Sequence, residues 1–288
     1  MKLTQIALTV LLSAAVAFGV VKVAGPAAQT APIKETRLEQ IKRTGVLRCG
    51  YMIWPPIINR DPNTGKMSGM NVDLFEEIGR QLGVKVEWTM EMSTAHAFAD
   101  LDSNRYDIGC ITYFITPARA REALFMNPIL YHPYYLFARA DDTRFDNNYA
   151  AANDPSVTFS TLDGEFSSIG ATEHFPQAKQ IALPQNASGS DLFLNVADKK
   201  ADLVVTEPMT FASFNTHNPN KLKQVTGEPV GIMPVSFPLP AKEYDLKEAL
   251  DATTLYLRGT KWFDALLDRY ENPEMKFLRL PALYQKPD

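Results

Sequence analysis

The sequence predicts an α/β protein of two lobes, each built on a mostly parallel sheet flanked by helices. Two observations lead to this prediction. Strand-like runs alternate with helix-like runs along most of the chain, and the alternation restarts after Pro133. Such alternation favours parallel strands joined by crossover helices. The restart indicates two α/β units in tandem, with a cleft between them.

The composition excludes several classes of protein. Of the 288 residues, 45% are hydrophobic and 22% are charged, which is typical of a globular chain rather than a disordered one. The formal net charge is -4, and no predicted helix carries a basic cluster, so nucleic acid is not an expected partner. The two cysteines and four histidines lack metal-ligand spacing. We therefore expect neither a metal nor a cofactor.

The N-terminal residues 1–28 have the features of an export signal. Lys2 precedes the apolar run Ile6–Val21, and no acidic residue occurs before Glu35. The sequence thus predicts a periplasmic protein. Two alternatives stay open: the segment is cleaved after export, or it is retained as an anchor in the inner membrane.

Residues 29–45 are expected to form a linker and a short helix, Arg37–Thr44, which Gly45 ends. Residues 46–133 then form the first part of lobe 1. Asn71 is expected to cap a helix that Gly83 ends. The other elements expected here are the strands Val46–Tyr51, Val84–Trp88 and Tyr106–Tyr113 and the helix Ala95–Asp102.

Residues 134–240 are assigned to lobe 2, residues 241–277 to helices that return to lobe 1, and residues 278–288 to a tail. The strands expected in lobe 2 are Tyr134–Arg139, Val157–Thr161, Lys179–Leu183 and Leu203–Thr206, followed by the apolar stretch Gly231–Pro238. Its expected helices are Gly164–His174, Ser190–Asp198 and Pro208–Phe214, and the returning helices are Asp245–Arg258 and Thr260–Tyr270.

Several motifs occur in a characteristic order: Gly69–Leu74, Ile115–Ala120, Ala201–Glu207, Leu246–Leu250 and Arg258–Trp262. Each motif alone is weak evidence of a family. The ordered set resembles the bacterial family 3 periplasmic solute-binding proteins, which serve amino-acid ABC transporters. The resemblance implies the type II periplasmic binding fold, with hinge crossings near Pro133 and Ala241. It also implies a monomer that binds a small carboxylate-bearing solute and delivers it to an inner-membrane ABC permease.

Three ligand-binding residues follow from this resemblance. Arg119 matches the family arginine that binds an α-carboxylate, and its planar guanidinium suits two oxygens. Thr116 would add a hydroxyl. Glu207 stands where the family has an aspartate that pairs with an α-ammonium. The structural alternatives are a solvated surface arginine at Arg119 and a helix N-terminal glutamate before Pro208 at Glu207.

The remaining candidates depart from the family pattern. Trp54 stands where an aromatic commonly lies against the ligand, although core filling would also explain it. Phe114 replaces a hydroxyl residue, and Glu165 and Phe166 replace a hydroxyl-bearing helix start. A glutamate at this point would repel an anion. The departures predict a more apolar pocket than a simple amino acid needs.

Cys49 and Cys110 fall in strands that this fold places side by side. They can form a disulfide in an oxidising compartment, or they can remain buried free thiols. Neighbouring parallel strands rarely orient two Cβ vectors for a bond, which favours the free thiols.

No complete catalytic constellation is present in the sequence, so a binding protein is the expected function. One enzymatic alternative stays open, because some relatives in this family are dehydratases of cyclohexadienyl acids. Glu165, Glu173 and Glu207 could then act as general acids in the cleft. Another alternative is a membrane-tethered sensor or accessory binding protein.

Overall fold

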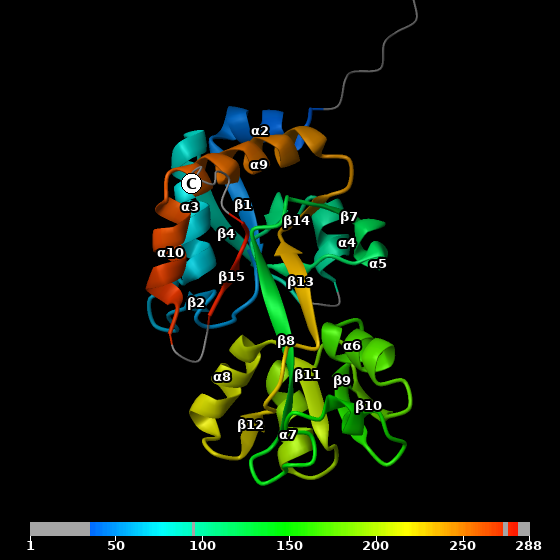
Figure 1. Ribbon diagram of the computed structural model, residues 1–288. Coiled ribbons are helices and arrows are strands. Elements are labelled where there is room, and N and C mark those ends of the chain that lie inside the picture. The colour runs from blue at the N-terminus through cyan, green and yellow to red at the C-terminus, as the bar shows by residue number, and fades with distance from the viewer. Residues whose placement is uncertain (1–34, 94–95, 273–275, 282–288) are drawn as a thin grey trace, which may run out of the picture. The chain divides into compact units, whose positions relative to one another are not determined.

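Two strands, β8 (Leu130–Arg139) and β13 (Gly231–Ser236), run antiparallel to each other and join two lobes (Figure 1). The computed structural model describes residues 35–93, 96–272 and 276–281. The predicted export signal, residues 1–28, lies outside them, as do most of the expected linker and tail. Within the described ranges, no helix is both long and apolar enough to cross a bilayer.

Lobe 1 is built around β1 (Val46–Tyr51) in a three-stranded sheet. β1 pairs in parallel with β4 (Lys85–Glu91) on one side and with β5 (Ile108–Gly109) on the other. The chain between β1 and β4 forms a hairpin, β2 (Asn59–Arg60) and β3 (Met67–Ser68), and then the helix α3 (Met70–Leu82). The helix α4 (Ala97–Asp102) lies between β4 and β5, and the short strand β6 (Tyr113–Phe114) follows β5. The expected strand Tyr106–Tyr113 is thus two short strands with a break at residues 110–112.

The start of α3 corrects one prediction. Asn71 does not cap this helix, because the N-cap is Gly69 and Asn71 lies inside the first turn, fully buried. Its side-chain amide donates to the Cys110 carbonyl oxygen at 2.9 Å and so links α3 to the end of β5. Gly69 has a φ of 124°, and a Cβ there would lie 2.4 Å from the Ile57 carbonyl oxygen. The close approach therefore requires glycine.

Lobe 2 contains a mixed sheet rather than a mostly parallel one. β9 (Thr158–Leu162) pairs in parallel with β10 (Lys179–Leu183) and with β11 (Leu203–Thr206). β8 pairs antiparallel with β11 and with β12 (Leu222–Gln224), because it enters this sheet from lobe 1. The helices of this lobe are η1 (Tyr149–Ala152), α6 (Phe166–His174), α7 (Gly189–Ala197) and α8 (Pro208–His217).

Both crossings between the lobes are formed by strands. β8 passes through Pro133 without a break, so no loop separates the lobes at this point. The second crossing is β13, which already pairs with β6 of lobe 1 at Val235 and Ser236, before Ala241. Residues 231–240 form one apolar stretch, and periodicity alone does not show where such a stretch changes lobes. Its end is β14 (Pro238–Pro240), which pairs with β7 (Ala123–Phe125).

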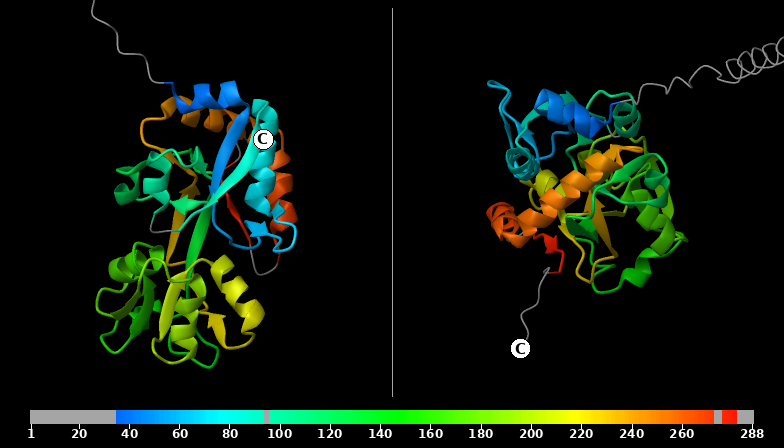
Figure 2. Two further views of the ribbon diagram at one scale, coloured as in Figure 1. Left: turned by 180° about the vertical axis from the view of Figure 1, so that it is seen from behind. Right: turned by 90° about the horizontal axis from the view of Figure 1, so that it is seen from above.

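The chain then completes lobe 1 with α9 (Tyr244–Gly259) and α10 (Trp262–Tyr270). α10 packs against α3 on one side of the lobe-1 sheet, and both views in Figure 2 show these two helices adjacent. The short strand β15 (Leu278–Arg279) pairs with β8. The predicted helix α2 (Arg37–Thr44) is confirmed, and Gly45 ends it in the left-handed conformation.

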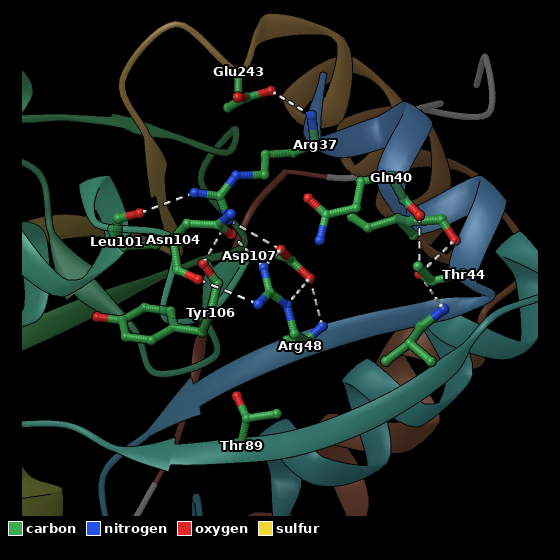
Figure 3. Close-up of polar contacts among 12 residues, drawn as sticks. Arg37, Gln40, Thr44, Arg48, Thr89, Leu101, Asn104, Tyr106, Asp107 and Glu243 are labelled. Atoms are coloured by element: carbon green, nitrogen blue, oxygen red, sulfur yellow. Dashed lines mark hydrogen bonds and ion pairs between the residues drawn. The ribbon is translucent and has the colours of Figure 1, made fainter. Parts of the chain in front are cut away.

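A buried carboxylate holds α2 onto this sheet (Figure 3). Asp107, only 1% exposed, accepts hydrogen bonds from Arg37 Nη1 at 3.1 Å and Arg48 Nη2 at 2.6 Å. Its other oxygen accepts from the Arg48 backbone amide at 2.8 Å. A buried carboxylate of this kind is stable only while its cations are present. The cluster therefore ties α2 to β1 and to the start of β5, and none of its three residues lines the cavity described below.

Cys49 and Cys110 are joined by a disulfide, with their Cα atoms 5.4 Å apart. The favoured prediction of free thiols was therefore wrong. β5 ends at Gly109, so Cys110 lies just beyond the paired residues of the strand. The orientation expected for two residues within adjacent parallel strands does not hold at this position.

Candidate functional site

A cavity of about 340 Å³ lies at the carboxyl ends of parallel strands from both lobes. Most of its lining residues come from the segments at the ends of β1, β5, β9 and β11, and from the first turns of α6, α7 and α8. The others lie in β6, α5 (Pro117–Ala120), β8 and β13. Ligand sites in α/β proteins form at this edge of a sheet, where helix N-termini converge. The lining residues used below are Trp54, Tyr113, Phe114, Arg119, His132, Tyr134, Glu165, Phe166, Glu207 and Thr210.

Arg119 lies on the short helix α5 (Pro117–Ala120) and is only 7% exposed, so it is not a solvated surface arginine. Its Nη2 contacts Glu165 Oε1 at 2.7 Å and donates to the Gly164 carbonyl oxygen at 3.2 Å. Its Nη1 donates to the Phe114 carbonyl oxygen at 3.2 Å, and the guanidinium lies 4.2 Å from the centre of the Phe114 ring. Both terminal nitrogens of Arg119 thus have partners within the chain.

Thr116 is placed differently from the prediction. It is the N-cap of α5, and its hydroxyl accepts a hydrogen bond from the Arg119 backbone amide at 3.1 Å. Thr116 is not among the residues that line the cavity. The residue therefore positions Arg119 through the first helical turn rather than facing a solute.

Glu165 is the N-cap residue of α6, but its side chain makes no capping bond and instead reaches Arg119 of the other lobe. Burial raises the pKa of Glu165, Arg119 lowers it, and the negative charge of Glu207 raises it further. The sequence predicted that Glu165 would repel an anion. In the structure it also neutralises the arginine that an anion would need.

Glu207 is the N-cap residue of α8, directly before Pro208, as the structural alternative anticipated. Its carboxylate still lines the cavity, where it accepts hydrogen bonds from the hydroxyls of Thr206, at 2.9 Å, and Thr210. Burial raises the pKa of Glu207, and the hydroxyl donors only partly oppose this effect. No lysine or arginine forms an ion pair with Glu207 within the described ranges.

Aromatic rings cover one wall of the cavity. Phe166 stacks on Tyr134, with centroids 3.8 Å apart, and meets Phe114 edge to face at 6.0 Å. Phe114 and Phe166 are each 4% exposed. This cluster agrees with the prediction of an apolar pocket. Trp54 also lines the cavity, but it is only partly buried, and its nearest ring is that of His132 at 6.4 Å.

Four of these lining residues were not predicted from the sequence: Tyr113, His132, Tyr134 and Thr210. His132 is 7% exposed, and burial lowers its pKa to about 4, so the imidazole is neutral at pH 7. The Tyr113 hydroxyl is buried and has no hydrogen-bond partner among the described residues. Thr210 lies one helical turn after Glu207, and this spacing is the one signal that could have identified it.

Glu173 does not belong to the cavity. It is exposed near the end of α6 and is absent from the lining. Of the three glutamates considered as general acids, only Glu165 and Glu207 face the site. No group of three or more histidine, cysteine, aspartate or glutamate side chains in the described part of the chain could hold a metal ion.

The fold is that of type II periplasmic binding proteins. The ancestral amino-acid-binding protein AncCDT-1, a precursor of cyclohexadienyl dehydratase, matches with a TM-score of 0.70 at 22% identity, covering 82% of this chain and 100% of that one. The cysteine-binding protein of Campylobacter jejuni matches with a TM-score of 0.69 at 21% identity, covering 84% and 98%. At these identities the likeness concerns the fold alone.

Relatives with detectable sequence similarity include two curated proteins. The cyclohexadienyl dehydratase of Pseudomonas aeruginosa is 27% identical over 178 residues, which is 60% of this chain. The membrane-bound lytic murein transglycosylase F of Cronobacter sakazakii is 23% identical over 188 residues, which is 64% of this chain. The chain spans 63% and 35% of these relatives, less than two thirds of either. The family model matches residues 47–273, most of the sequence, and the chain belongs to the bacterial extracellular solute-binding proteins, family 3.

Proposed function

We propose that the protein is an exported solute-binding protein that captures a small amine-bearing solute, an amino acid or a related compound, in the cavity between its lobes. The observation that carries this proposal is Glu207, a carboxylate facing an apolar cavity with hydroxyl partners only. A buried carboxylate of this kind is stabilised most by a cation that neutralises its charge. A solute ammonium supplies that cation.

The position of the cavity supports reversible capture. Its lining is drawn from both lobes, so a bound solute contacts both, and such contacts exist only while the lobes are close together. Binding is therefore expected to favour a compact state and to raise the melting temperature. Small-angle scattering with and without a confirmed solute checks the first effect, and an unchanged profile at saturation would count against the proposal.

A ligand screen tests the proposed function directly. The protein purified after export is heated in the presence of amino acids, simple amines and small carboxylates, and hits are confirmed by calorimetry. We expect at least one amine-bearing compound to bind with a stoichiometry of one. Failure of every amine-bearing compound, with the protein folded, would refute the proposal.

Export and delivery to an ABC permease belong to the same proposal. The apolar N-terminal segment supports export, and residues 1–45 fused to a reporter that is active only in the periplasm should give activity there. N-terminal sequencing of the exported product distinguishes a cleaved signal from an anchor. For delivery, loss of the protein should abolish cellular uptake of the confirmed solute, and unchanged uptake would contradict this step.

One observation favours a second candidate function, a dehydratase that acts on a cyclohexadienyl acid. Glu165 and Glu207 line the same cavity as Arg119, and burial raises the pKa of both carboxyls, as general acids require. Incubation with a cyclohexadienyl acid should then yield the ultraviolet absorbance of an aromatic product. Turnover by the parent that is lost in Glu207→Gln would support this candidate, and no turnover would exclude it for that acid.

A further inference from the structure

Three charged side chains line the cavity: Arg119, Glu165 and Glu207. His132 adds no charge at pH 7, because burial lowers its pKa to about 4. With both glutamates ionised, the lining carries one positive and two negative charges. The site is therefore balanced by a ligand with a single positive charge, whereas a zwitterion leaves one negative charge without a partner.

The positive charge is already matched within the protein. Arg119 Nη2 is 2.7 Å from Glu165 Oε1, and its remaining bonds are to the Phe114 and Gly164 carbonyl oxygens. The guanidinium also packs over the Phe114 ring. A ligand carboxylate that binds Arg119 Nη2 must displace Glu165, which would leave that glutamate partly buried without a counter-ion.

The second negative charge is not matched. Glu207 accepts hydrogen bonds from Thr206 and Thr210, both neutral hydroxyls. The aromatic wall of Phe114, Tyr134 and Phe166 provides an apolar surface for a hydrocarbon group, and π faces also attract cations. The volume of about 340 Å³ suits a small organic molecule.

We propose that the ligand is a small organic amine without a free carboxylate, whose ammonium binds Glu207. Glu165 is then a specificity-determining residue, because its carboxylate occupies the position on Arg119 that an amino acid would use. This inference rests on the proposed function and narrows it. The sequence predicted that Arg119 binds a carboxylate, and the Arg119–Glu165 ion pair opposes that role while Glu165 is present.

Calorimetry with matched pairs of compounds tests the inference. Phenethylamine is compared with L-phenylalanine and isoamylamine with L-leucine, since the members of each pair differ only by the carboxylate. We expect the amine of at least one pair to bind the parent protein at least tenfold more tightly than its amino acid. Glu207→Gln should weaken that amine at least tenfold.

Glu165→Gln gives the sharper test. This variant removes the internal counter-ion and leaves the Arg119 guanidinium available, so the amino acid of the pair should gain at least tenfold in affinity relative to the amine. Glu228→Gln, which changes an exposed glutamate outside the lining, is the control and should leave the preference unchanged.

The outcomes separate the inference from the proposed function. If the parent binds the amino acids as tightly as the amines, or more tightly, the inference fails while the function as a solute-binding protein stands. A preference that Glu165→Gln does not change would also overturn the role of Glu165. If no amine-bearing compound binds the folded protein, in these pairs or in the ligand screen, the proposed amine-binding function fails with the inference.

Discussion

Arg119 of α5 and Glu165 at the start of α6 form an ion pair of 2.7 Å that links lobe 1 to lobe 2 through the wall of the cavity. The two residues are 46 positions apart in the sequence. Their side chains are 8% and 24% exposed, so the pair is shielded more than a surface salt bridge. We therefore expect the pair to affect both the stability of the lobe contact and the choice of ligand.

A double-mutant cycle on Arg119→Ala and Glu165→Gln should give a coupling energy clearly above the ~0.5 kcal/mol typical of exposed pairs. Arg119→Ala alone should destabilise the fold by about 3 kcal/mol, because it leaves a partly buried carboxylate without its cation. Urea denaturation measures both quantities. Arg121→Ala, a neighbouring exposed arginine, is the control and should change little. A coupling near zero would show that the pair adds nothing to stability.

Glu207→Gln should stabilise the protein at pH 7, because it removes a buried negative charge that lacks a cation. The folded-state pKa of Glu207 is raised, so its ionisation costs stability as pH rises from its unfolded pKa through the folded one. The advantage of the variant should therefore shrink below about pH 4.5, where the parent glutamate is protonated. Melting temperatures at pH 7 and pH 4 check this. A variant less stable than the parent at pH 7 would contradict the assignment.

His132 should make stability fall as the pH is lowered. Its pKa is about 4 in the folded protein against about 6.5 when unfolded, so the unfolded chain binds the extra proton first. Between these values the residue contributes a loss of about 3 kcal/mol. Unfolding free energies of the parent and His132→Phe, measured from pH 7 to pH 4, isolate this contribution from other titrating groups. Parallel pH curves for the two proteins would refute it.

Asp107→Asn should destabilise lobe 1 by about 3 kcal/mol, since Arg37 and Arg48 lose the charge that they share. No residue of the cluster lines the cavity, so ligand affinity per folded molecule should stay the same. Chemical denaturation and calorimetry measure the two effects separately. Asp102→Asn, at an exposed position, serves as the control.

The elements that the sequence predicted best are those set by local chemistry. Gly45 and Gly83 end their helices in the left-handed conformation, and the apolar run Leu203–Thr206 is a strand. The prediction that Asn71 caps α3 was wrong, because asparagine is common at N-caps but also suits a buried hydrogen bond, here to the Cys110 carbonyl oxygen. Local patterns do not distinguish these two uses.

The candidate site was predictable in part. The ordered motifs, and the positions where the sequence departs from the family pattern, identified six residues that line one cavity: Trp54, Phe114, Arg119, Glu165, Phe166 and Glu207. The partner of Arg119 was not predictable, because it depends on how two lobes meet and not on sequence spacing. His132 was missed for a related reason, since a lone histidine in a strand carries no signal of its burial.

The central claim is that a ligand amine binds Glu207 while Glu165 stays paired with Arg119. Its most direct test is a crystal structure of the protein with its confirmed ligand, in which the contacts of Arg119 and Glu207 are determined. The account predicts that the Arg119–Glu165 ion pair persists and that a ligand nitrogen lies within about 3 Å of a Glu207 carboxylate oxygen. A ligand carboxylate on Arg119, with Glu165 displaced, would contradict it.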